Sequence, residues 1–205
     1  MIVVIGQVGA QRSESGDIEP SGFAAEVALA AAKDGAKVEL VSRLGDDLTG
    51  DAVVIGLAQA GVGHVATLRD GGAPTWIAAA ETADVDDTGS DDGVGRTPSD
   101  LDAADIGLAL RYLSDYSVIV LAHPHDPGVL DEALGAAGWG SAHLVVVSSP
   151  GTEPPLAVPS DAIVVTADRG AEATASRVGR YAAAVDSGAG LDRAYAVLTG
   201  ANAES

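Results

Sequence analysis

Residues 41–63, VSRLGDDLTGDAVVIGLAQAGVG, run from the end of an apolar strand through a Gly-Asp-Asp turn into a helix. A mostly apolar surface over residues 52–60 identifies the helix, and Gly61 ends it. Asp47 or Thr49 offers a side-chain oxygen to the free amides of the first turn. The stretch therefore predicts a strand, a capped turn and a helix in succession.

The same alternation continues along the chain. Apolar strand patterns occur in MIVVIG, YSVIVLAH, AHLVVVSS and DAIVVTA, and helical patterns lie between most of them. Apolar strands that alternate with helices indicate a mostly parallel sheet covered on both faces. The 205 residues, with 47% hydrophobic content, suit a single α/β domain over residues 1–205.

The charge of the chain is strongly acidic, with 30 Asp and Glu against 11 Lys and Arg and a net charge of -19. Such a surface repels nucleic acid and anionic membranes, so neither is expected as a partner. The acidity is typical of a halophilic protein, and a high-GC bacterial source is the alternative. No stretch approaches the roughly 18 apolar residues of a membrane span, and no basic leader precedes MIVVIG, so we expect a cytoplasmic protein. The absence of cysteine excludes disulfides and thiolate metal sites.

Ligands of open parallel sheets bind at the carboxyl ends of the strands, which makes the turns after the strands the candidate functional segments. After the first strand the sequence reads GQVGAQ, which is not the G-x-G-x-x-G fingerprint of dinucleotide binding. A P-loop lysine is also absent.

The stretch AAAKDGAKVELVSRLGDDLTGDAVVIGLAQAGV resembles the first signature region of the ribokinase or PfkB carbohydrate kinases, with Gly45, Asp47 and Gly50 in its G-x-D-x-x-G turn. SGFAAEVALAAA is similar to the family's G-G-x-A-A-N-x-A segment, APTWIAAAETAD to its Pro-Thr strand, and GLDRAYAVLTGANA to its closing helix. The resemblance implies a ribokinase-like three-layer α/β sandwich with a small β lid near residues 64–84, which an acidic loop at 84–100 follows.

What the resemblance implies about activity is ATP-dependent phosphorylation of a sugar or nucleoside hydroxyl, with ATP and Mg as cofactors. It places Gln11, Gly22 and Glu26 around the substrate, together with Gly45 and Asp47 of the turn. It also implies that the lid closes over the substrate or pairs between subunits. Because the lid edge would expose Trp76 and Ile77, a homodimer through the lid is a further expectation.

The sequence departs from the family pattern on the substrate side and in catalysis. On the substrate side, Gln11 replaces an aspartate, Ser21 the first of two glycines, and Glu26 an asparagine.

The catalytic base of the family is the aspartate of a G-A-G-D motif, whose glycines bind the transferred phosphoryl group of ATP. Aligning DRGAEATA on this motif makes Gly170 the candidate cofactor-binding residue but leaves Ala173 in place of the aspartate. Asp168 and Asp192 are candidate substitute bases. The N-x-x-E motif that orders magnesium is not recognisable. We therefore expect a sugar-binding or nucleoside-binding protein, or an interaction protein, without phosphotransfer, and an ATP-dependent kinase with a relocated base is the alternative.

One further group is found in AHPHD, which places His123, His125 and Asp126 directly after an apolar strand. Two histidines and a carboxylate have the chemistry of a zinc site. A surface loop with titratable histidines is the other interpretation, and because no third clear ligand lies nearby in the sequence, no metal is expected.

Overall fold

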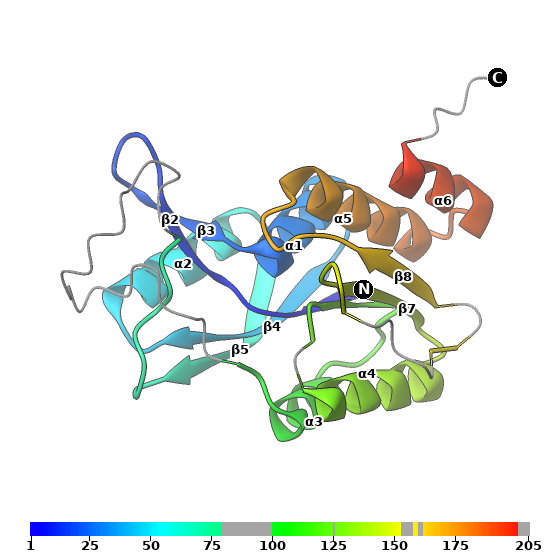
Figure 1. Ribbon diagram of the computed structural model, residues 1–205, viewed down its shortest axis with the longest axis horizontal. Helices are drawn as coiled ribbons and strands as arrows, with labels where there is room; N and C mark the ends of the chain where they lie inside the picture. Colours follow the sequence, from blue (N-terminus) through cyan, green and yellow to red (C-terminus); the bar gives the residue numbers. More distant parts are fainter. Residues whose placement is uncertain (79–99, 125, 153–157, 160–161, 201–205) are drawn as a thin grey trace.

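The computed structural model describes residues 1–78, 100–124, 126–152, 158–159 and 162–200. A six-stranded sheet has the order β5-β4-β1-β6-β7-β8, and every neighbouring pair is parallel (Figure 1). The strands are β1 (Ile2–Ile5), β4 (Val38–Gly45), β5 (Val62–Asp70), β6 (Val118–Ala122), β7 (His143–Ser148) and β8 (Ile163–Thr166). The helices are α1 (Phe23–Lys33), α2 (Leu48–Gln59), α3 (Ala103–Tyr112), α4 (Pro127–Gly140), α5 (Glu172–Asp186) and α6 (Leu191–Thr199).

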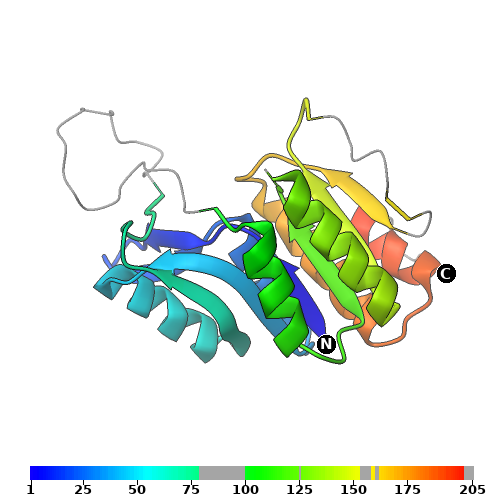
Figure 2. The ribbon, with the colours of Figure 1, turned by 90° about the horizontal axis from the view of Figure 1, so that it is seen from below.

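Helices cover both faces of the sheet, which confirms the three-layer prediction. Alternate residues of β1 face opposite layers. Ile2 and Val4 belong to a core with α1, α2, α5 and α6, whereas Val3 and Ile5 belong to a core with α3 and α4. Figure 2 shows α3 and α4 together on one side of the sheet. Because both faces are buried, the central strands are apolar throughout.

The close packing of α1 against α5 depends on a glycine. A Cβ atom at Gly179 of α5 would lie 2.4 Å from the backbone oxygen of Val27 in α1. The two helix backbones therefore approach more closely than a side chain at this position would allow. None of the helices in the described part of the chain is long and apolar enough to span a bilayer.

Part of the segment expected as a lid, residues 64–70, belongs to the main sheet. Residues 62–70 form β5, which pairs in parallel with β4 in the main sheet. Its position follows from the β4-α2-β5 order, because a crossover helix returns the chain to the edge of the same sheet. The two-stranded antiparallel sheet consists instead of β2 (Gly9–Arg12) and β3 (Ile18–Ser21). The sequences GAQR and IEPS carry no apolar alternation, so these strands could not be recognised from the sequence.

The edge at Trp76 and Ile77 is covered within the chain. Ile77 is 3% exposed and forms a bridge with Ala10 of β2, while the Trp76 ring packs on Gly9. Ile77 is therefore covered within the chain, whereas Trp76 is half-buried. The remainder of the expected lid and most of the acidic loop fall on residues 79–99, which lie outside the described residues.

Candidate ligand-binding site

Asp47 of the Gly-Asp-Asp turn links the start of α2 to Thr75 through hydrogen bonds. Asp47 is the N-cap of α2, and its carboxylate accepts a hydrogen bond from the Gly50 N–H at 2.7 Å. The same carboxylate accepts hydrogen bonds from the Thr75 N–H at 2.6 Å and the Thr75 hydroxyl at 2.8 Å. Burial by itself raises the pKa of Asp47, but the hydrogen bonds from Thr75 and Gly50 outweigh it and hold the pKa below its usual value.

The two glycines of the turn make room for Thr75. A Cβ atom at Gly45 would lie 2.3 Å from the Thr75 nitrogen, and one at Gly50 would lie 2.8 Å from the Thr75 hydroxyl oxygen. Gly45 and Asp47 thus hold a neighbouring segment, and neither is among the residues that line the two hollows described below. Sequence reasoning missed Thr75, because a partner 28 residues downstream has no characteristic spacing.

Gln11 and Glu26 line the same hollow, about 470 Å³ in volume, between the small sheet, α1 and α5. Glu19 of β3 and Glu172 of α5 line it with them. Gly22 is the N-cap of α1 and has a φ of 103°, a conformation that other residues avoid. The structure therefore places these residues, which the family resemblance assigned to the substrate, around the start of α1.

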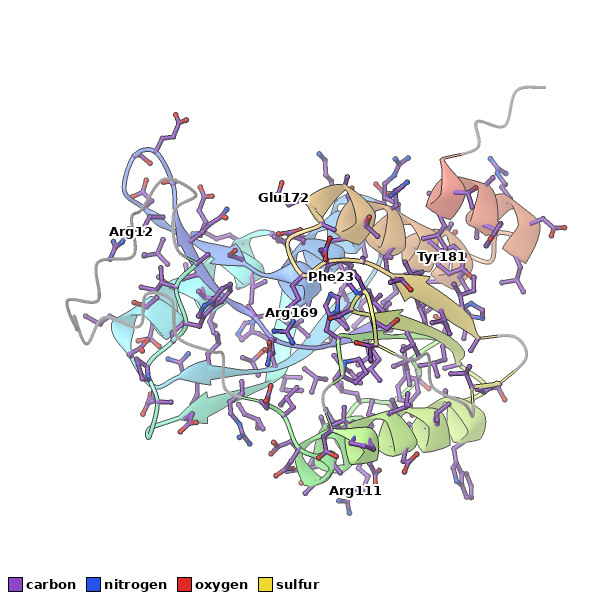
Figure 3. The ribbon with its side chains drawn as sticks, in the orientation of Figure 1. Arg12, Phe23, Arg111, Arg169, Glu172 and Tyr181 are labelled. Carbon is purple, nitrogen blue, oxygen red and sulfur yellow. The ribbon has the colours of Figure 1, made fainter. Side chains whose placement is uncertain are left out.

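Glu26 has an unusual electrostatic environment. Its Oε2 atom is buried and has no hydrogen-bond partner among the described residues. Burial, together with the negative charge of Glu172, raises the pKa of Glu26 to about 7. Figure 3 shows Glu172 at the N-terminal end of α5. Near neutral pH the Glu26 carboxyl group is therefore partly protonated, so it both donates and accepts hydrogen bonds.

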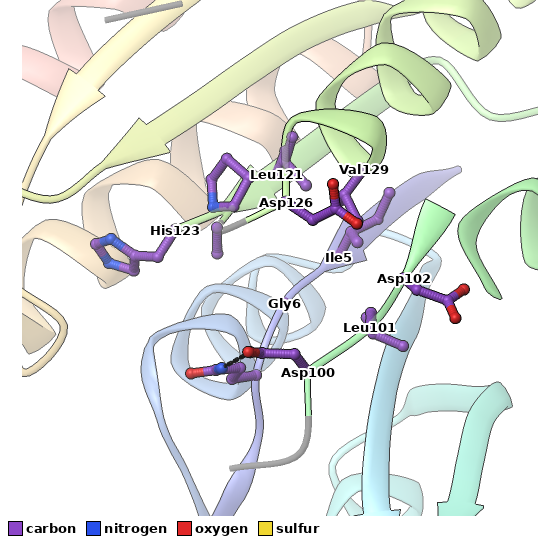
Figure 4. Close-up of a pocket in the computed structure, with 12 residues that line it drawn as sticks. Ile5, Gly6, Asp100, Leu101, Asp102, Leu121, His123, Asp126 and Val129 are labelled. Atoms are coloured by element: carbon purple, nitrogen blue, oxygen red, sulfur yellow. Dashed lines mark hydrogen bonds between the residues drawn. The ribbon is translucent and has the colours of Figure 1, made fainter. Parts of the chain in front are cut away.

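A second hollow, about 380 Å³ in volume, lies at the carboxyl ends of β1 and β6 (Figure 4). Apolar side chains such as Ile5 and Leu121 form part of its wall. Gln7 donates a hydrogen bond to Asp100 at its rim. The other polar or charged side chains that line it are those of Asp102, His123 and Asp126.

His123 follows β6 with a backbone φ of 50°, which is unfavourable for a residue with a side chain. The residue is 8% exposed. Its Nδ1 atom lies 3.2 Å from the Ser149 hydroxyl oxygen, and its ring meets the Phe23 ring edge-on with the centroids 4.9 Å apart. These contacts hold the imidazole in place in spite of the strained backbone.

Of the candidate metal ligands in AHPHD, Asp126 has a structural role. The Asp126 side chain caps α4 by accepting a hydrogen bond from the Gly128 N–H at 2.8 Å. His125 lies outside the described residues. Within the described ranges, no group of three His, Asp or Glu side chains is arranged to hold a metal ion.

The candidate bases Asp168 and Asp192 lie at opposite ends of the parallel strands, one at the carboxyl ends and one at the amino ends. Asp168 and Gly170 lie in the turn between β8 and α5, at the carboxyl edge, but neither lines the two hollows. At the other end of α5, Asp186 binds the Met1 amino group at 2.5 Å, beside the start of β1. Asp192 lies in the first turn of α6, which follows α5 at this end of the molecule. The structure therefore does not bring Asp192 together with Gln11 or Glu26.

The arrangement of the chain matches solved structures. The Sa239 protein aligns over 100% of this chain and 94% of its own, with a TM-score of 0.67 and 12% identity. A ribokinase from Arabidopsis thaliana, solved with ribose and ATP, aligns over 94% of this chain and 88% of its own, with a TM-score of 0.63 and 12% identity. The fold is ribokinase-like.

A fructokinase from Xylella fastidiosa, solved with bound ATP, shares this ribokinase-like fold less closely. Its TM-score is 0.51 at 16% identity, and the chain spans 65% of its length. No family model matches the sequence, and no curated protein matches it. At these identities the likeness shows the fold alone.

The side chains that line the two hollows offer no positive charge to the triphosphate of ATP. Phosphate groups in proteins are held by Arg, Lys or the free amides of helix N-termini. None of the described residues that line either hollow is Lys or Arg, whereas several are carboxylates. Arg169 lies in the turn before α5, outside both sets of lining residues (Figure 3), and Glu172 places a negative charge in the first turn of α5.

Proposed function

We propose that this ribokinase-like protein binds a small, uncharged molecule rich in hydroxyl groups, such as a sugar or nucleoside, and does not transfer phosphate. The observation that carries this proposal is the chemistry of the hollow beside Glu26. Its polar lining consists of Gln11, Glu19, Glu26, Glu172 and Ser176, which offer acceptors to hydroxyl donors and no positive charge to a phosphate.

The position of Ala173 supports the absence of phosphotransfer. The family resemblance places the catalytic aspartate there, and Ala173 lies in the first turn of α5. A methyl group cannot accept a proton from a hydroxyl, so the alternative kinase would need another base. Asp168 is the candidate that lies at the carboxyl edge.

The test is a thermal-shift titration with D-ribose, D-fructose, adenosine and ATP with Mg²⁺, in high salt. We expect at least one of the neutral compounds to raise the unfolding temperature and ATP to have no effect. The stabilisation should be lost in Glu26→Ala, because the hydrogen bonds from the ligand hydroxyls to its carboxyl group are removed. Glu14→Ala, which changes an exposed carboxylate outside the hollow, is the matched control.

Turnover is measured in parallel with ATP, Mg²⁺ and the same three neutral compounds. We expect no phosphorylated product above background. Phosphorylation that disappears in Asp168→Asn would overturn the proposal and assign Asp168 as the base of an active kinase. Binding that is unchanged in Glu26→Ala but lost in His123→Ala would move the site to the second hollow.

A further inference from the structure

Two carboxyl groups from neighbouring helices share the hollow beside Glu26. Glu26 lies in the first turn of α1 and Glu172 in the first turn of α5, and both line the hollow. The two helices pack closely here, since a Cβ atom at Gly179 would lie 2.4 Å from the oxygen of Val27, the residue after Glu26. Glu172 is exposed, so water solvates its charge, whereas Glu26 is half-buried. Of the two groups, Glu26 is therefore the one that burial favours in its neutral form.

The charged side chains that meet Glu26 in the hollow are both negative. Among the described residues they are Glu172 of α5 and Glu19 of β3. The basic side chains on the strands and helices around α1 do not line the hollow; they are Arg12, Arg43, His64, Arg69, Arg177 and Arg180. Ionisation of Glu26 would therefore place a further negative charge beside two others, which is unfavourable in a partly buried site.

The buried oxygen of Glu26 also favours the neutral form. Oε2 is buried and accepts no hydrogen bond from the described residues. A charged oxygen without a donor costs far more to bury than a neutral carbonyl oxygen in the same place. With a proton on Oε1, the buried Oε2 atom becomes such a neutral oxygen, and Oε1 becomes a hydrogen-bond donor. The pKa of Glu26, which burial and the charge of Glu172 raise to about 7, agrees with this geometry.

We propose that Glu26 recognises the ligand as a neutral carboxyl group, donating a hydrogen bond from Oε1 to a ligand oxygen, and that the charge of Glu172 helps to keep the proton there. Glu172 is then a positioning residue, because it acts through Glu26. The ligand is a neutral compound that presents an oxygen lone pair at this point, whereas an ammonium group would favour the ionised carboxylate. The contact with a ligand rests on the proposed function, but the position of the proton does not.

The test is the affinity for D-ribose and adenosine, measured by titration calorimetry at several pH values between about 6 and 8. We expect the affinity to fall about ten-fold over this range, because only the protonated fraction of Glu26 is competent to bind. Glu26→Gln carries a fixed donor, so its affinity should not depend on pH. Glu172→Gln should shift the fall in affinity to lower pH. Glu14→Gln, at an exposed side chain outside the hollow, is the control and should keep the pH dependence of the unaltered chain.

Affinity that stays constant or rises with pH in the unaltered chain would overturn the proposal, because the ionised carboxylate would then bind at least as well. A pH dependence that persists in Glu26→Gln would also overturn it, since another group would be titrating. An unshifted fall in Glu172→Gln would overturn the role of Glu172.

If neither compound binds at any pH, the proposed function fails, and the position of the proton is decided separately. The carbon-13 NMR signal of the Glu26 carboxyl carbon, assigned by its loss in Glu26→Gln, is followed against pH. A titration midpoint near 7 supports a neutral Glu26 carboxyl group, whereas a midpoint near the ordinary value of 4.5 overturns it.

Discussion

The carboxylate of Asp47 accepts hydrogen bonds from the backbone N–H and the hydroxyl of Thr75, at 2.6 and 2.8 Å. The same group caps α2, so one side chain fixes a helix start and a distant segment at once. Thr75 is almost fully buried, and the loss of its partner would leave its N–H without an acceptor.

Asp47→Ala should therefore destabilise the protein. We expect the free energy of unfolding to fall by about 2 to 3 kcal/mol, from the lost cap and the buried donor left unpaired. Urea denaturation measures the change, and Asp46→Ala should differ from the unaltered chain by less than about 0.5 kcal/mol, as is usual for a surface substitution. A fall of equal size in both variants would contradict the assignment.

The raised pKa of Glu26 predicts a pH dependence of stability. The pKa is about 7 in the folded chain against 4.5 as the ordinary value, so the folded state binds more protons between these values. The stability that protonated Glu26 contributes is fully present below pH 4.5 and is lost as the pH rises through 7. Relative to Glu26→Gln, the unaltered chain should lose stability over this window, measured as urea midpoints at several pH values.

Glu172→Gln provides the check on the cause. Removing this negative charge should move the pKa of Glu26 down toward its ordinary value, although burial still raises it. The pH window of the stability loss should shift accordingly. A window that stays in place would show that burial alone accounts for the raised pKa.

The net charge of -19 predicts a dependence on salt. Repulsion between like charges is screened as the Debye length falls from about 10 Å at 0.1 M salt to about 3 Å at 1 M. We expect the midpoint of thermal unfolding to rise over this range, as measured by circular dichroism in sodium chloride. An unchanged midpoint would favour compositional bias over adaptation to high salt.

The packing of α1 on α5 predicts opposite effects of Gly→Ala at two helix positions. Gly179→Ala should lower the free energy of unfolding by about 1 to 3 kcal/mol, because the new Cβ atom meets the Val27 oxygen at 2.4 Å. Gly135 of α4 has no neighbouring atom within 4 Å of such a Cβ, so Gly135→Ala should raise stability by about 0.5 to 1 kcal/mol. Similar changes at both sites would contradict the close approach of the helices.

The alternation of strands and helices was predictable because the strands of a sheet covered on both faces have to be apolar throughout. The patterns of IVVI in β1 and VIVLA in β6 carry this information locally. The short strands GAQR and IEPS were not predictable, since they pair only with each other and have no apolar alternation. That residues 64–70 belong to the main sheet was not predictable either, because the strand pattern of β5 does not reveal that its neighbour is β4.

The sequence by itself determined the alternating α/β order and the glycine turn of a ribokinase-like fold, because these depend on residues close together in the chain. Tertiary structure alone decided what the turn holds and what lies beside Glu26. Thr75 is 28 residues from Asp47, and Glu172 comes from a helix far along the chain. Hydrogen bonds and charge interactions of this kind depend on distance in space. The packing of α1 against α5 and the contact of Thr75 with the start of α2 set those distances.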